Sequence, residues 1–325
     1  MTVSSVLQAG KTELFEDERA EKRFAFLKAH GLEQATLLPL PGDASGRRYF
    51  RLPNALLMDD PSDDTVQFQF IADVLQGCGL SVPQIYEADH LNGFLLIEDW
   101  GDQSYRKALE QIPEKTLYET TIRSLIHLHQ NLSEPVVGIP FYDSNLFLEK
   151  ASLFTEWYED PLSETAKADF KQLWESAYHN QPQVPHSLAL RDVMVDNLIW
   201  LPKRSGMNKS GFIDFQDGSW NPITYDLFSL LQDARRDVDP VLADDLLELY
   251  INSFPNLDPK DFYASYALWG AQRTTRIIGT FYRLARRDRK PQYLRYIPRL
   301  KDTLEICFSH PNLWELRDWF KMVTL

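Results

Sequence analysis

Two stretches of the chain decide its fold and its chemistry: residues 188–200, LALRDVMVDNLIW, and residues 211–227, GFIDFQDGSWNPITYDL. Both place acidic residues between apolar runs that are typical of short strands. They predict a loop that presents Asp192 and Asn197, followed by a strand that delivers Asp214. One carboxylate can orient a hydroxyl and accept its proton, while an amide oxygen and a second carboxylate suit Mg²⁺ on phosphate groups. The pattern therefore predicts phosphoryl-transfer chemistry.

A structural explanation competes with this one, because Asp and Asn also cap turns between strands. Any one of the three residues alone would favour that explanation. All three in this order and spacing, flanked by NLIW and GFID, favour a functional site.

The chain before these stretches is rich in predicted strands. Residues 15–30 predict an opening amphipathic helix. Residues 37–52, LLPLPGDASGRRYFRL, predict a β-hairpin that leads into a third strand, NALLMDD, at residues 54–60. A short helix around residues 68–75 follows. The apolar run of FLLIEDWGD, residues 94–102, then breaks into acids and a glycine, which predicts a hinge.

Helical spacing of apolar residues dominates the rest of the chain, beginning with the segment from Glu114 to Leu132. Strands first and helices later predict an α+β protein with two lobes. The expected division is a small β-rich lobe at residues 1–97, a hinge at 98–102 and a larger helical lobe at 103–325.

Composition restricts the class of protein and its partners. With 44% hydrophobic and 25% charged side chains, the 325-residue chain is globular. Its net charge of −13 argues against a nucleic-acid partner. Its N-terminus lacks the cationic start and apolar block of a signal peptide, and no segment has the ~20 apolar residues that span a bilayer. We therefore expect a cytoplasmic location and no membrane partner. Two cysteines make no disulfide framework.

The two opening stretches resemble the catalytic loop (HxDxxxxN) and the metal-binding segment (IDFxD) of the aminoglycoside phosphotransferase and choline kinase family, which has a protein-kinase-like fold. The resemblance implies ATP and Mg²⁺ as cofactors, Asp192 as the catalytic base, and Asn197 and Asp214 as metal ligands. It also implies that Asp226 supports the catalytic loop from beneath by hydrogen bonding. Asp217 would contact a second metal or the substrate.

The predicted hairpin, PGDASGRRYFRL, resembles the loop that covers the nucleotide in this family. The resemblance implies cofactor contacts from Gly42, Ser45, Gly46, Arg47 and Arg48. A plain hairpin would use the two glycines equally well, and a run of arginines is commonly a solvated face. FLLIEDWGD resembles the hinge, where main-chain groups near Glu98, Asp99 and Trp100 would contact the adenine. Main-chain contacts do not depend on side-chain identity, so this segment does not distinguish ATP, the expected nucleotide, from GTP.

The chain departs from the family pattern at two positions. Leu190 stands where the catalytic loop usually begins with His, and His186 is a candidate for the missing polar support. Met58 and Asp59 stand where most kinases place a phosphate-binding Lys. The nearest cations to that position are Arg47, Arg48 and Arg51.

Further segments resemble bacterial anomeric kinases for N-acetylmuramate and N-acetylglucosamine, notably the GDASGRRYFRL loop, the LLMDD strand without Lys, and WGAQRTTRIIGTFYRLARRDRKPQYLRYIPR near the end. The implied reaction transfers the γ-phosphoryl group of ATP to the C1 hydroxyl of an amino sugar. Arg273 and Arg276 would then meet a substrate carboxylate, unless they belong to a cationic solvent face.

Two other functions stay open. One is a kinase of the same fold that acts on another alcohol, such as an aminoglycoside or choline. The other is a pseudokinase that binds nucleotide without catalysis, which the residue at position 190 and the missing Lys motivate. The expected partner is a small molecule, and a monomer is the favoured state.

Overall fold

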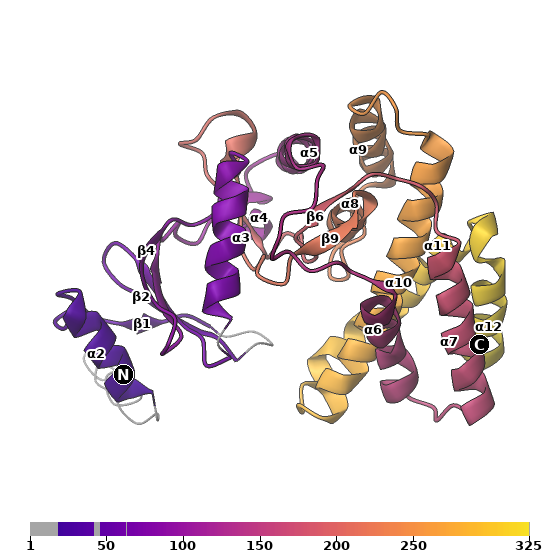
Figure 1. Ribbon diagram of the computed structural model, residues 1–325, viewed down its shortest axis with the longest axis horizontal. Coiled ribbons are helices and arrows are strands. Elements are labelled where there is room, and N and C mark those ends of the chain that lie inside the picture. Colours follow the sequence, from indigo (N-terminus) through magenta and orange to yellow (C-terminus); the bar gives the residue numbers. More distant parts are fainter. Residues whose placement is uncertain (1–18, 42–45, 63, 325) are drawn as a thin grey trace. The chain divides into compact units, whose positions relative to one another are not determined.

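The computed structural model describes residues 19–41, 46–62 and 64–324, and Figure 1 shows its course. The chain divides into two compact units: Met1–Gln103 with Ile199–Gln216, and Ser104–Leu198 with Asp217–Leu325. The cofactor contacts expected from Gly42 and Ser45, and the start of the opening helix, lie outside the described residues.

The first unit contains a five-stranded antiparallel sheet in the order β1-β2-β3-β5-β4. Its strands are β1 (Leu38–Pro39), β2 (Arg48–Arg51), β3 (Leu56–Asp59), β4 (Ile85–Asp89) and β5 (Phe94–Ile97), and its helices are α2 (Ala20–Ala29) and α3 (Thr65–Gly77). Phe26 and Leu27 of α2 pack on Phe50, Leu57 and Phe94 of the sheet. The predicted hairpin, the third strand and the short helix are therefore confirmed.

Residues 199–216 group with the first unit, although the sequence placed them in the helical lobe. They form the hairpin of β7 (Leu198–Trp200) and β8 (Ser210–Phe212), joined through the 3₁₀ helix η1 (Gly206–Lys209). Backbone hydrogen bonds help to attach this hairpin to the first unit: Trp200 N–H donates to the Gln103 carbonyl, and Phe212 N–H donates to the Ser81 carbonyl. These are long-range contacts, which the local sequence pattern does not reveal.

The second unit is mainly helical. Its helices are α4 (Tyr105–Ala108), α5 (Glu114–Asn131), α6 (Ser144–Trp157), α7 (Glu164–His179), α8 (Thr224–Leu231), α9 (Pro240–Asn252), α10 (Pro259–Arg286), α11 (Ile297–Phe308) and α12 (Trp314–Thr324), with 3₁₀ helices η2 (Pro291–Tyr296) and η3 (Pro311–Leu313). A two-stranded antiparallel sheet pairs β6 (His186–Ala189) with β9 (Ser219–Pro222). The helix predicted from Glu114 is confirmed as α5.

Helix α10 is the longest element and runs through the second unit, where it contacts α6, α8 and α11 (Figure 1). Asp258 caps it by accepting the N–H of Lys260, and Pro259 suits its first turn. Gly279 allows α6 to approach closely, because a Cβ there would lie 2.3 Å from the backbone carbon of Leu153. This packing holds α10 against α6, and α10 is the helix that carries Arg273 and Arg276.

Within the described part of the chain, no helix is both long and apolar enough to cross a membrane.

Candidate active site

The predicted catalytic loop follows β6 in the second unit and rests on a carboxylate beneath it. Asp226, in the first turn of α8, accepts the backbone N–H of Leu190 at 2.6 Å and that of Arg191 at 2.8 Å. Arg191 has a φ of 74°, a left-handed conformation that costs a non-glycine residue roughly 1–2 kcal/mol. The two hydrogen bonds hold the loop in this strained conformation just before Asp192.

Asp226 is buried to 1% exposure, and its environment affects its ionisation. Burial raises the pKa of Asp226 to about 7, even though the two backbone donors lower it. The nearby charge of Asp192 raises it further. Asp226 is therefore a structural carboxyl group whose charge changes near neutral pH.

Asp192 lies within reach of two arginines of α10. Its Oδ1 is 3.4 Å from Nη2 of Arg273 and 3.5 Å from Nη2 of Arg276. Burial raises the pKa of Asp192, but Arg276, Arg273 and Arg191 together hold it below its usual value. With 34% of its side chain exposed, Asp192 is a carboxylate that solvent or an acceptor hydroxyl can reach at neutral pH.

The two arginines themselves are buried, with side-chain exposures of 2% for Arg273 and 13% for Arg276. The alternative of a cationic solvent face therefore does not hold at these two positions, while the predicted contact with a substrate carboxylate stays a prediction. They are buried because α10 packs against α6, α8 and α11, and both guanidinium groups pair with the carboxylate of Asp192. Burial lowers the pKa of Arg276, but nearby Tyr225, Asp192, Tyr142 and Asp217 together raise it above its usual value. The backbone carbonyl of Asp217 accepts a hydrogen bond from Nη1 of Arg191 at 3.2 Å.

Asn197 closes the catalytic loop. Its Nδ2 donates to the carbonyl of Asp192 at 2.9 Å. This bond assigns the amide nitrogen to the loop, and Oδ1 is the atom of this side chain whose type suits a hard cation.

Asp214 belongs to the first unit and follows β8. Its φ is 59°, again a left-handed conformation for a non-glycine residue. Nε2 of Gln216 donates to Asp214 Oδ1 at 3.0 Å, and Nη1 of Arg47 approaches the same oxygen at 3.4 Å. The side chain is 48% exposed, so the carboxylate is oriented by its neighbours yet open to a ligand. Strain at such a position is typical of functional sites.

Neighbouring arginines of the predicted nucleotide loop have different partners. Arg47 donates through Nε to Asp60 at 2.7 Å and approaches Asp214, whereas Arg48 pairs with Asp59 at 3.3 Å. Arg47 immediately precedes β2 and Arg48 is the first residue of that strand, so the two side chains leave the chain at the point where the strand begins. Burial raises the pKa of Asp60, but hydrogen bonds from Ser62 and the pair with Arg47 hold it below its usual value. Arg47 is therefore the cation of this loop that lies near the candidate metal ligand.

Arg48 lies in a buried ion cluster centred on Asp59, whose carboxylate is fully buried. Arg19 and Arg23 of the N-terminal segment each reach Asp59 at 2.6 Å. Asp59 stands at the end of β3, the strand in which most kinases place a Lys, and here it joins α2 to the sheet. Gly46, which precedes Arg47 and Arg48, is not needed for a close approach, because a Cβ there would lie 3.9 Å from Cγ of Pro61.

The predicted hinge residues are joined to the β7–β8 hairpin. Glu98 lies 3.4 Å from Arg204, whose guanidinium also stacks 5.1 Å above the Trp100 ring. Asp99 is paired with Arg51 at 2.6 Å. Side chains in this segment therefore fix its shape, and a main-chain contact to a nucleotide base remains a prediction.

His186 lies away from the position it was expected to support. Its Nδ1 is 3.1 Å from the carbonyl of Val184 at the beginning of β6, whereas Leu190 follows the other end of that strand. Leu190 itself is buried, and its contact with Asp226 is made by the backbone. The polar support of the loop thus comes from α8, without a side-chain donor at position 190.

The residues present fit a magnesium-bound nucleotide. Asn197 in the second unit and Asp214 in the first each carry the kind of side-chain oxygen that Mg²⁺ binds, and Mg²⁺ commonly takes one or two such protein ligands together with substrate phosphates. Across the residues that the structure describes, no group of three or more His, Cys, Asp or Glu side chains could hold a metal ion without further ligands.

A sequence profile of the phosphotransferase enzyme family matches residues 36–263. The chain belongs to this family. An N-acetylmuramate/N-acetylglucosamine kinase of Caulobacter vibrioides is 33% identical, over 93% of this chain and 96% of the relative. A protein of the same name from Pseudomonas aeruginosa is 32% identical, over 87% of each chain. The predicted family membership is confirmed.

Solved structures confirm the predicted kinase-like α+β fold. A choline/ethanolamine kinase family protein from Mesorhizobium loti matches with a TM-score of 0.65 at 14% identity, covering 93% of this chain and 99% of the other. A GDP complex of a point mutant of aminoglycoside 2'-phosphotransferase-IIIa matches with a TM-score of 0.65 at 15% identity, covering 91% of this chain and 100% of the other. These identities are low, so the matches establish the fold alone.

Sequence reasoning missed three residues of the site: Asp60, Gln216 and Arg191. The sequence contained a signal for Asp60, namely the predicted hairpin. Its antiparallel register pairs Arg48 with Asp59, and continuing that register places Arg47 opposite Asp60. The sequence contained no comparable signal for Gln216 and Arg191, because their contacts depend on the left-handed backbone conformations at residues 214 and 191.

Proposed function

We propose that this chain transfers the γ-phosphoryl group of ATP, with Mg²⁺, to the C1 hydroxyl of N-acetylmuramate or N-acetylglucosamine. The observation that carries the proposal is the 33% identity, over 93% of the chain, to a kinase named for these two sugars. The site residues described above supply the chemical groups that such a transfer needs.

Asp192 is the catalytic base in the proposed reaction. Its carboxylate accepts the proton of the C1 hydroxyl as the sugar oxygen attacks the γ-phosphorus, and the bond from that phosphorus to the β,γ-bridging oxygen breaks to release ADP. The neighbouring arginines keep this carboxylate ionised at neutral pH. Because it rests on Asp226, the loop holds Asp192 in place before substrate binds.

Asn197 and Asp214 are the proposed metal ligands, and Arg47 is the proposed phosphate contact. Mg²⁺, when bound, neutralises charge on the β- and γ-phosphates. Arg47 is anchored by Asp60 and directed toward Asp214, so it can replace the missing strand Lys. Arg48 was also expected to bind the cofactor, but its pairing with Asp59 makes it the weaker candidate.

The charges around Asp192 favour a neutral or anionic acceptor. Three guanidinium groups, from Arg191, Arg273 and Arg276, act on this carboxylate. They repel a polycationic aminoglycoside, whereas an N-acetylated sugar carries no cationic amine. N-acetylmuramate adds a carboxylate, which an arginine-rich environment accommodates.

The test measures ADP release with ATP, Mg²⁺ and each of four acceptors: N-acetylmuramate, N-acetylglucosamine, kanamycin and choline. Turnover is expected with the two amino sugars alone. The methyl glycoside of N-acetylglucosamine is the matched control, because its C1 oxygen carries no proton and it should give no turnover. Loss of the reducing end in the product would locate the phosphate at C1.

The other outcomes each exclude part of the proposal. Turnover with kanamycin or choline would identify a kinase of another alcohol. Turnover with the methyl glycoside would move the reaction to a different hydroxyl. Saturable Mg·ATP binding without turnover of any acceptor would favour a nucleotide-binding pseudokinase.

A further inference from the structure

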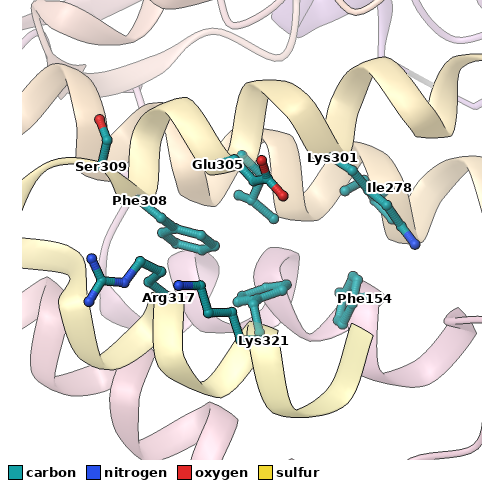
Figure 2. A pocket seen from close by; sticks show the side chains of 10 residues that line it. Phe154, Ile278, Lys301, Glu305, Phe308, Ser309, Arg317 and Lys321 are labelled. Carbon is teal, nitrogen blue, oxygen red and sulfur yellow. The ribbon is translucent and has the colours of Figure 1, made fainter. Parts of the chain in front are cut away.

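A cavity of about 360 Å³ lies in the second unit, among helices α6, α10, α11 and α12. Its floor is apolar and is formed by Phe154, Ile278, Leu304, Phe308 and Phe320, all of which are buried. Three cationic side chains and one acid, Lys301, Arg317, Lys321 and Glu305, stand around its opening (Figure 2). None of these residues takes part in the candidate active site.

The cations are unevenly distributed around the opening. Lys301 and Glu305 lie four residues apart on α11, where opposite charges compensate. Arg317 and Lys321 also lie four residues apart, on α12, where like charges destabilise a helix. Figure 2 shows these two side chains extending in the same direction along the cavity.

The pair on α12 is only weakly neutralised by the protein. Arg317 contacts Asp318 at 3.2 Å, but both side chains are about half exposed, and such surface pairs contribute little. Among the residues that the structure describes, none forms an ion pair with Lys321. Two like charges therefore stand over an apolar cavity in a chain whose net charge is −13. The lining carries three cationic side chains and one acid, a balance opposite in sign to that of the whole chain.

We propose that this cavity binds an aliphatic carboxylate, with the hydrocarbon chain on the phenylalanine-lined floor and the carboxylate between Arg317 and Lys321. A carboxylate there would replace the like-charge repulsion with two charge-assisted hydrogen bonds. The volume lies in the range of small-molecule pockets, and the lining is apolar with a few polar groups at one end, which matches an amphipathic ligand.

The test titrates the full chain with hexanoate, octanoate and decanoate by isothermal calorimetry. One ligand should bind per chain, and each added methylene should lower Kd by about threefold to fourfold if the chain enters the apolar floor. Decyltrimethylammonium is the matched probe of opposite charge and should not bind. No acceptor sugar or turnover is involved, so failure here and failure of the proposed kinase activity are distinguishable.

Two surface variants test the charged end without disturbing the core. Arg317→Gln and Lys321→Gln should each raise the Kd for decanoate by roughly fivefold or more. Lys171→Gln removes one exposed positive charge from α7 and should leave the Kd unchanged. Leu304→Trp, which fills the cavity, should abolish binding while circular dichroism confirms folding.

Three results would overturn the proposal. The first is an affinity that does not change with chain length, and the second is equal binding of decanoate and decyltrimethylammonium. The third is a concentration-dependent dimer, seen by light scattering, that Lys321→Gln disrupts and decanoate does not, because the occupant would then be a second copy of this chain.

Discussion

The backbone N–H of Leu190 donates to Asp226 at 2.6 Å, so the catalytic loop is supported through main-chain atoms. This relationship explains how an apolar residue can occupy the position where the family usually has His. The Leu190 side chain packs in the interior, and the hydrogen-bonding function belongs to α8.

Leu190→His should therefore bring no gain in activity. We expect kcat to change by less than about threefold, and stability to fall by about 1–3 kcal/mol because an imidazole would be buried without a partner. Asp226→Ala is the contrasting variant: it leaves two buried N–H groups unsatisfied and should lower both stability and kcat. Urea denaturation with steady-state kinetics separates the two effects. A large rise in kcat for Leu190→His would contradict this account of the loop.

Replacement of the two arginines of the nucleotide loop should separate their roles. Arg47→Gln should raise the KM for ATP about tenfold or more, since a charge-assisted phosphate contact is lost. Arg48→Gln is the matched control and should leave that KM within about twofold, because Asp59 keeps Arg19 and Arg23 as partners. Equal effects of both variants on the KM would show that the loop acts as a diffuse cationic surface.

The proposed base and metal ligand should fail in different ways. Asp192→Asn should lower kcat by about 10²–10⁴ with little change in nucleotide affinity, as expected for loss of a general base. Asp214→Ala should instead abolish the Mg²⁺ dependence of ATP binding. Fluorescence titration of ATP with and without Mg²⁺, beside steady-state rates, distinguishes the two. Full turnover by Asp192→Asn would exclude it as the base.

Arg276 should control the ionisation of Asp192. The guanidinium lowers the pKa of this carboxyl group, so Arg276→Gln should raise it. Activity requires the ionised form, and the acidic limb of the kcat profile should therefore move to higher pH. Measurement of kcat between pH 4 and 8 tests this, with Arg283→Gln on the same helix as the control. An unshifted limb would mean that Arg276 acts on the substrate alone.

His129 should make folding stability depend on pH. Burial lowers the pKa of His129 to about 3, and its Nδ1 is 2.6 Å from the Tyr250 hydroxyl. Between pH 3 and 6.5 the unfolded chain binds this proton and the folded chain does not, so stability rises with pH by up to about 1.4 kcal/mol per unit. His129→Gln should remove that contribution from the slope measured by urea denaturation at several pH values.

Asp226 should act in the opposite sense over part of the same range. Its pKa of about 7 lies above that of an unfolded Asp, so the folded chain holds the proton and stability falls as pH rises from about 4 to 7. Comparison of each variant with the parent chain isolates its contribution, because all other groups are shared. A similar change of slope in His129→Gln and Asp226→Asn would contradict both assignments.

The sequence by itself determined the order of the secondary structure and the chemical types in the site. Local periodicity predicted the hairpin, the third strand and the helix from Glu114, because strand and helix periods are written into neighbouring residues. The order of Asp192, Asn197 and Asp214 predicted the family, because each has the side chain that its proposed role needs.

Only the tertiary structure decided which charges meet. Arg47 and Arg48 are neighbours in sequence, yet one approaches Asp214 and the other pairs with Asp59. Arg273 and Arg276 had the spacing of a solvent face, but packing around α10 buried them beside Asp192. Ion pairing and burial depend on distances between segments far apart in the chain, and local sequence patterns do not contain those distances.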